Sequence, residues 1–331
     1  MHVQWFAHLP GVQLDASLSS HEVAEGRIGN LTFDEWCELD PSFPYSAAEY
    51  NESRPAFYIA SAEIEGDLKA VLTQVSDRIY QFYQALLLDA RVPWLPEPQL
   101  SVHYVRVNLK AGVATYRLVG PFEREWILDG NQIVYLFDSA ALRSLDVVFE
   151  LLAFKDECER NNPDEFTLPG INAGLEVLVR TARPDAWWDQ NGVHHVNDFV
   201  HCTAALENLL VPANGVVDDL KITSTFGEHA AVLVSKSRQN LKQLAQSYAG
   251  LHRLRSNLIH GQMAMSDLNA SDQHVLRLGR ILLREVLIKA MALNKRQYDK
   301  VSIAMMLKKA YSEEAYHKVM HTQFREVEAL I

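Results

Sequence analysis

The chain has 331 residues, of which 48% are hydrophobic and 22% charged, as in a globular protein with room for two domains. Its three cysteines stand far apart, so neither a disulfide framework nor a cysteine-based zinc site is expected, and a reducing cytoplasm fits. The start of the chain lacks a signal-peptide pattern, and no window approaches about 18 uncharged apolar residues. We therefore expect a cytoplasmic protein without a membrane-spanning segment.

The first part of the chain mixes strand-like and helical patterns. Residues 1–60 indicate an irregular start that contains strands, and apolar residues at helical spacing predict a helix over residues 67–88. Two segments with alternating or β-branched residues around positions 110–112 predict a hairpin. Further helices are expected over residues 139–155 and 171–181.

These elements predict an N-terminal mixed α/β domain over residues 1–190. It contains no G-x-G-x-x-G, no P-loop and no G-x-S-x-G, so its role does not follow from a motif. Residues 183–188, which include two adjacent tryptophans, mark the expected junction with the next domain.

Four side chains directly after this junction have the residue types of metal ligands. A helix would bring His194, Asp198 and His201 to one side, with His195 beside them. Two of the four stand at the expected helix start, however, and no H-E-x-x-H pattern accompanies them. A metal site is therefore the less favoured interpretation, and we expect no cofactor.

The rest of the chain is predicted to be entirely helical, as a second domain over residues 191–331. A single basic amphipathic helix is expected near the C-terminus, over residues 295–324, packed against the other helices. The preceding helices are predicted over residues 199–210, 228–237, 241–260 and 272–293.

Charge is divided unevenly along the chain, whose net charge is −11. Residues 201–331 hold 17 Lys and Arg against 12 Asp and Glu, a net of +5. Residues 1–200 hold 14 against 30, a net of −16. A basic second half favours contact with a polyanion such as RNA, whereas the simpler alternative is two solvated surfaces of different composition.

The predicted helix over residues 241–260 carries an arginine on its apolar side. At about 100° per residue, Arg255 falls in the middle of that side, where a permanent charge is costly unless an anion meets it. His260 follows five residues later, at the helix end marked by Gly261. Taken alone, Arg255 is explained more simply by a structural carboxylate that pairs with it. His260 alone is explained more simply by the negative end of the helix dipole, which favours a cation.

Together, the two residues form a known pattern. The segment Arg255-Ser-Asn-Leu-Ile-His260-Gly261 reads R-x4-H-G, after helices containing AALENLLVP and EHAAVLVSKS and before a long apolar helix. In this order the last 130–140 residues resemble the HEPN superfamily, in particular Apea-like HEPN domains. The resemblance implies a C-terminal all-α HEPN-type helical bundle. With the N-terminal mixed α/β domain that the patterns predict, the expected fold class is α+β.

The resemblance also implies metal-independent RNA cleavage, in which the 2′-hydroxyl attacks the adjacent phosphorus and leaves a 2′,3′-cyclic phosphate. Arg255 would stabilise the pentavalent phosphate, and His260 would transfer the proton. Ser256 or Asn257 would hold the substrate or orient these side chains. Glu207 stands where related domains often carry an acid that faces the motif helix, so it is expected to pair with Arg255; the alternative is an exposed helical glutamate.

A single helix aims these two residues poorly at one phosphate. Positions five apart differ by about 140° after one full turn and by roughly 7.5 Å of rise. In the HEPN family two protomers meet along the motif helices. The resemblance therefore implies a homodimer in which Arg255 and His260 of both protomers line a shared cleft for RNA, such as tRNA or mRNA.

Three functions follow from these patterns. The first is a HEPN endoribonuclease in phage defence or acting as a toxin, with the N-terminal domain sensing a trigger or selecting substrate. The second is a catalytically inactive HEPN module that binds nucleotide or RNA or serves dimerisation. The intact motif favours catalysis, whereas Ser256 stands where active members often carry Asn, Asp or His. The third is a metal hydrolase that uses residues 194–201.

Overall fold

The computed structural model describes most of the chain, and it divides into two compact units, Met1–Phe149 and Glu150–Ile331. The protein belongs to the broad α+β class, with a sheet in the first unit and helices through the second. The residues described are 1–9, 12–15, 17–18, 20–23, 26–40, 46–47, 56–89, 103–109, 112–118, 135–161, 168–181, 192–211, 221–263, 270–294, 300–325 and 327.

The first unit is built on a six-stranded sheet with strand order β3-β4-β5-β1-β6-β7, in which all neighbouring strands run antiparallel. A short parallel pair, β2 (Val12–Leu14) with β8 (Tyr135–Phe137), accompanies it. The strands of the sheet are β1 (His2–Leu9), β3 (Ser20–Val23), β4 (Gly26–Asn30), β5 (Ala56–Glu63), β6 (His103–Leu109) and β7 (Gly112–Leu118).

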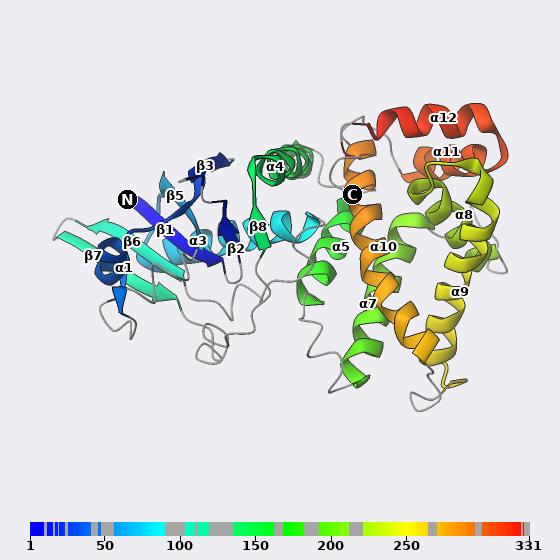
Figure 1. The fold of residues 1–331 in the computed structure, drawn as a ribbon, viewed down its shortest axis with the longest axis horizontal. Helices are drawn as coiled ribbons and strands as arrows, with labels where there is room; N and C mark the ends of the chain where they lie inside the picture. Colours follow the sequence, from blue (N-terminus) through cyan, green and yellow to red (C-terminus); the bar gives the residue numbers. More distant parts are fainter. Residues whose placement is uncertain are drawn as a thin grey trace. The chain divides into compact units, whose positions relative to one another are not determined.

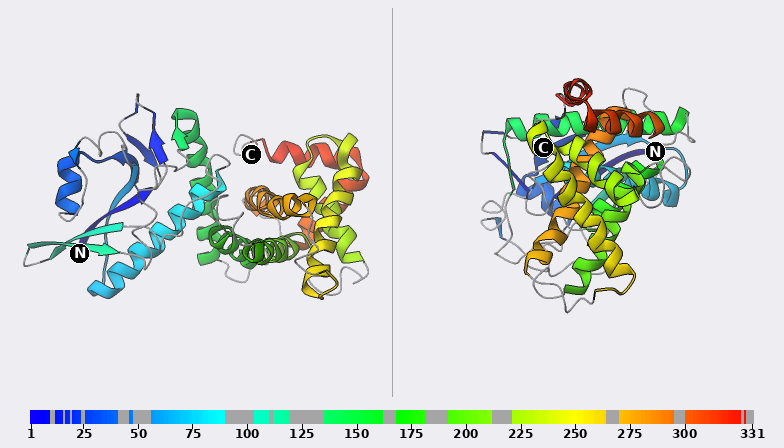
Figure 2. Two further views of the ribbon diagram at one scale, coloured as in Figure 1. Left: turned by 60° about the horizontal axis from the view of Figure 1, so that its bottom comes forward. Right: turned by 90° about the vertical axis from the view of Figure 1, so that its right-hand side faces the viewer.

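Helices cover both faces of this sheet (Figures 1 and 2). Helix α3 (Leu68–Leu88) packs on one face, where the ring of Phe82 stacks on that of Tyr58 at 3.8 Å. The short helix α1 (Phe33–Leu39) packs on the other face through Trp36, whose ring lies 4.7 Å from that of Phe57. The apolar core of this unit therefore lies in two layers.

The structure confirms three expectations in this unit. The helix over residues 67–88 and the hairpin around residues 110–112 are present as α3 and β6–β7. The strands expected in the first 60 residues are present as β1 to β4 and the beginning of β5. β1 pairs with β5 and β6, so its partners come from distant parts of the chain and are not visible in the local pattern.

The second unit is a bundle of helices (Figure 1). Helix α10 contacts α5, α7 and α8, and α9 packs along α8. The division between the units falls inside α4. The helices are α4 (Ser139–Asn161), α5 (Leu168–Arg180), α7 (Gly192–Leu210), α8 (Ile222–Val234), the 3-10 turn η3 (Arg238–Asn240), α9 (Leu241–Ile259), α10 (Ala270–Asn294), α11 (Lys300–Ser312) and α12 (Glu314–Gln323).

Two sequence-based boundaries differ from the structure. The two units divide between Phe149 and Glu150, whereas the sequence patterns placed the expected domain boundary at residue 190. Helix α5 packs against α7 and α10 and so groups with the helical unit. The expected junction at residues 183–188 lies outside the described residues. The single helix expected near the C-terminus is two helices, which meet at Glu313 in an extended conformation. Arg238 donates to the carbonyls of Tyr311 and Ser312, at 3.1 and 2.6 Å, and so caps the end of α11.

Close packing of α8 on α9 gives a test of this arrangement. A Cβ at Gly227 would meet the Ala245 carbonyl oxygen and would lie 2.9 Å from the Ala249 nitrogen, so Gly227→Ala forces backbone apart. We expect it to lower the free energy of unfolding by about 1–3 kcal/mol. A Cβ at Gly250, in the middle of α9, meets nothing within 4 Å, so Gly250→Ala should raise that free energy by about 0.5–1 kcal/mol. Equal effects of the two changes in urea unfolding would contradict the packing.

Candidate functional site

The candidate site lies where α7, α8 and α9 meet, and its backbone is anchored at the end of α9. Gly261 has a φ of +66°, the left-handed conformation that ends many helices. The N–H of Gln262 donates to the Asn257 carbonyl at 2.9 Å, and that of Gly261 to the Leu258 carbonyl at 3.4 Å. This pair of bonds is a Schellman motif, which holds His260 at the last turn of the helix.

Arg255 forms the ion pair that the sequence suggested. Its Nη1 donates to Oε2 of Glu207, which α7 contributes. The two side chains remain 22% and 29% exposed, so the pair lies in a partly open position rather than a sealed interior. Among the described residues, the buried Nε of Arg255 has no hydrogen-bond partner, so Glu207 does not use all the donors of the guanidinium.

A histidine that the sequence interpretation overlooked completes this contact. Nε2 of His252 lies 3.3 Å from the same Oε2 of Glu207, and its Nδ1 lies 3.0 Å from Oγ1 of Thr223 on α8. The hydrogen bond from His252 and the charge of Arg255 lower the pKa of Glu207, against the effect of its partial burial. The carboxylate therefore stays charged near neutral pH.

The only local signal for His252 was its spacing. It stands three residues before Arg255, which places both side chains on one side of α9. Thr223 carried no signal, because the expected helix began at residue 228 whereas α8 begins at Ile222.

His260 lies apart from this cluster. Its side chain is exposed at the end of α9, and in the described part of the chain no hydrogen bond or ion pair joins it to Arg255. Ser256 and Asn257 are partly exposed between them. Within one chain, the structure thus brings together Arg255 and Glu207 of the predicted site residues and leaves His260 separate from them.

Comparisons with known proteins identify no relative. No family model matches the chain, and neither the curated proteins nor the solved structures contain a significant match. The functional interpretation therefore rests on the residues of this site.

Within the described residues, the histidine-rich stretch at the start of α7 forms no metal centre. Asp198 is buried and His201 is exposed, although they stand three residues apart on one helix. The side chains of His194 and His195 lie outside the described residues. Among the residues that the structure describes, no three His, Cys, Asp or Glu side chains come together as a ligand set.

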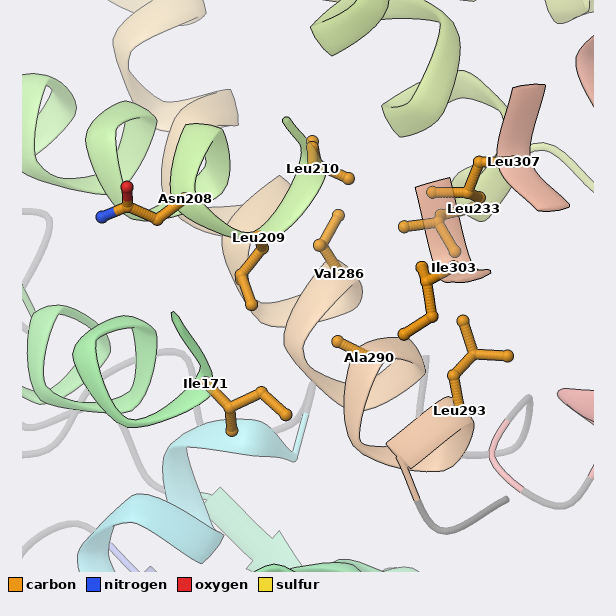
Figure 3. A pocket seen from close by; sticks show the side chains of 10 residues that line it. All are labelled: Ile171, Asn208, Leu209, Leu210, Leu233, Val286, Ala290, Leu293, Ile303 and Leu307. Atoms are coloured by element: carbon orange, nitrogen blue, oxygen red, sulfur yellow. The ribbon is translucent and has the colours of Figure 1, made fainter. Parts of the chain in front are cut away.

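A small apolar cavity lies elsewhere in the helical unit (Figure 3). Its volume is about 20 Å³, which is room for about one water molecule. It is lined mainly by leucine, isoleucine and valine side chains, and Figure 3 shows the amide of Asn208 pointing away from them. This cavity is too small and too apolar to hold a nucleotide.

No helix in the described ranges has both the length and the apolar character needed to cross a membrane.

A buried histidine next to the site predicts acid sensitivity of the second unit. Nδ1 of His229 on α8 donates to the carbonyl of Leu210, the last residue of α7, at 2.7 Å. Burial lowers the pKa of His229 from 6.5 to about 4. Between these values the unfolded chain binds more protons, so the free energy of unfolding should fall by about 3 kcal/mol as the pH falls from 6.5 to 4.

Urea unfolding of the wild type and of His229→Gln as a function of pH checks this prediction. Glutamine cannot titrate, so its curve should be flatter between pH 6.5 and 4. His8 in the first unit, whose pKa burial and His103 lower to about 3, contributes equally to both proteins. Parallel curves for the two proteins would contradict the assignment to His229.

Proposed function

We propose that the chain is a metal-independent endoribonuclease of the HEPN type, which cleaves RNA by attack of the 2′-hydroxyl on the adjacent phosphorus. The observation that carries the proposal is the partly exposed guanidinium of Arg255 on α9, which Glu207 of α7 holds in place. His260 is exposed at the end of the same helix α9. An arginine fork suits a phosphate, and a histidine can exchange a proton near neutral pH.

Each residue has a defined part in this reaction. His260 takes or returns the proton while the 2′-oxygen bonds to phosphorus and the bond to the 5′-oxygen breaks. Arg255 stabilises the negative charge that accumulates on the pentavalent phosphate. Glu207 orients Arg255, and Ser256 and Asn257, partly exposed between the two, contact the substrate. The products are a 2′,3′-cyclic phosphate and a 5′-hydroxyl.

The separation of Arg255 from His260 favours a homodimer as the active form. The two side chains leave α9 about 140° apart, so a second protomer is needed to bring a histidine to the phosphate that an arginine contacts. Ile259, between them in sequence, is 49% exposed. An exposed apolar side chain within the motif is consistent with a surface that a partner covers.

RNA is the proposed substrate because the motif region is basic. Residues 221–255 contain six Lys and Arg against one acidic residue, Glu228. Helix α9 contains no carboxylate at all. Such a surface attracts a phosphate backbone without reading its sequence. A tRNA or mRNA target fits this charge, and a role in phage defence or as a toxin would leave sensing or substrate selection to the first unit.

The alternative is an inactive HEPN module that binds nucleotide or RNA or serves dimerisation. One observation favours it: Glu207 already neutralises Arg255, as a purely structural ion pair would. Ser256 at the position after the arginine has the same implication.

Incubating the purified chain with RNA in EDTA distinguishes the two. The proposal predicts fragments ending in a 2′,3′-cyclic phosphate, and no cleavage where a single 2′-deoxynucleotide replaces the nucleotide at the cut site. Binding without fragments would favour the inactive module. Cleavage that requires added divalent metal would favour a metal hydrolase instead.

A further inference from the structure

Four side chains from three helices form a continuous hydrogen-bonded chain behind the proposed site. We propose that Thr223 and His252 are positioning residues, which hold Glu207 and through it aim the guanidinium of Arg255 at the phosphate. The catalytic consequence of this inference rests on the proposed function. The contacts themselves do not.

The direction of each hydrogen bond follows from chemistry. A carboxylate only accepts, so Nε2–H of His252 and Nη1–H of Arg255 both donate to Oε2 of Glu207. In the neutral ring Nδ1 then accepts, and the hydroxyl of Thr223, 3.0 Å away, supplies the hydrogen. The order is Thr223 to His252 to Glu207, with Arg255 arriving at the same oxygen.

The four side chains differ in burial, and His252 is the most buried of them. The side chain of His252 is only 10% exposed, that of Arg255 22% and that of Glu207 29%. The most buried member thus stands behind the carboxylate, where the substrate does not reach it. Phe226 of α8 packs on the ring of His252 with their centroids 5.3 Å apart, which limits the ring's rotation.

A single ion pair would hold Glu207 poorly. A free glutamate loses side-chain entropy when it is fixed, and the free energy gained from a partly exposed ion pair barely exceeds that loss. His252 and Arg255, about one helical turn apart on α9, both donate to the same oxygen of Glu207 and so restrict the carboxylate to one orientation. A misplacement of about 1 Å can lower a rate about 100-fold, so this restraint matters for catalysis.

The hydrogen bonds from Thr223 to His252 to Glu207 form a relay, which near-isosteric variants can test. Thr223→Val keeps the shape and removes the hydroxyl, and Ser224→Ala removes a neighbouring exposed hydroxyl, bonded to the Lys221 carbonyl, as a matched control. His252→Gln keeps a donor near the position of Nε2, whereas His252→Asn is too short to reach Glu207.

For RNA cleavage, we expect Thr223→Val and His252→Asn to lower kcat about 10- to 100-fold with KM little changed. His252→Gln should retain more activity than His252→Asn, and Ser224→Ala should behave as wild type. Equal kcat values for Thr223→Val and Ser224→Ala would overturn the inference.

A second measurement separates this inference from the proposed function. In urea unfolding, the midpoint shifts of Thr223→Val and Glu207→Gln should be less than additive in the double variant, because the two residues act through one chain of bonds. This holds even if the wild type cleaves no RNA, an outcome that removes the proposed function alone. Additive shifts would overturn the relay, whatever the activity.

Discussion

Replacing Arg255 by alanine is expected to lower the rate of RNA cleavage about 100- to 1,000-fold, the usual effect of removing a donor aimed at transition-state charge. Lysine at this position should recover only part of the rate. It keeps the charge but lacks the fork that can contact Glu207 and a phosphate together. Rates of fragment formation from a defined RNA, measured with excess enzyme, check this prediction.

Arg253→Ala is the matched control for this change. Arg253 stands two residues earlier on the same helix and is exposed. Its loss removes the same charge and should weaken RNA binding slightly without the loss of rate. Thermal unfolding of both variants shows whether Glu207, left without its arginine, destabilises the bundle. Equal rates for Arg255→Ala and Arg253→Ala would remove Arg255 from the chemistry.

Replacing His260 by alanine should lower the cleavage rate about 100- to 10,000-fold, because the proposed reaction loses its proton-transfer group. The fold should be unaffected: the side chain is exposed, and the helix end is held by backbone bonds around Gly261. The measurement is the cleavage rate together with the unfolding midpoint, which should match that of the wild type.

His201→Ala provides the control for a lost exposed histidine. His201 lies on α7, outside the Arg255 cluster, so its replacement should leave cleavage intact. The opposite pattern, with activity lost in His201→Ala and kept in His260→Ala, would move the site to the histidine-rich stretch and favour metal chemistry.

Local features of the sequence were enough to predict the motif helix. Apolar spacing placed it over residues 241–260 and Gly261 marked its end; the structure has Leu241–Ile259, closed by a left-handed glycine. The same periodicity predicted α3 and α10 within a few residues. The pairing of Glu207 with Arg255 was also predicted, but from the resemblance rather than from spacing.

What the sequence could not predict depends on contacts between distant segments. The start of α8 was missed because Ile222, Thr223 and Thr225 are β-branched and Gly227 follows, and these residues weaken a helical signal. The helix forms there because it packs closely on α9. Without that start, Thr223 could not be placed beside His252. Strands were expected in the first 60 residues, but their pairing was not, because β1 pairs with β5 and β6 from distant parts of the chain.

We propose that two protomers contribute Arg255 and His260 to one phosphodiester, and mixing two inactive variants tests this shared site. Arg255→Ala and His260→Ala are combined in equal amounts and allowed to exchange subunits. If half of the dimers are mixed and each has one intact composite site, about a quarter of the wild-type activity should return. No recovery, with mixed dimers confirmed by native mass spectrometry, would contradict a site shared between two protomers.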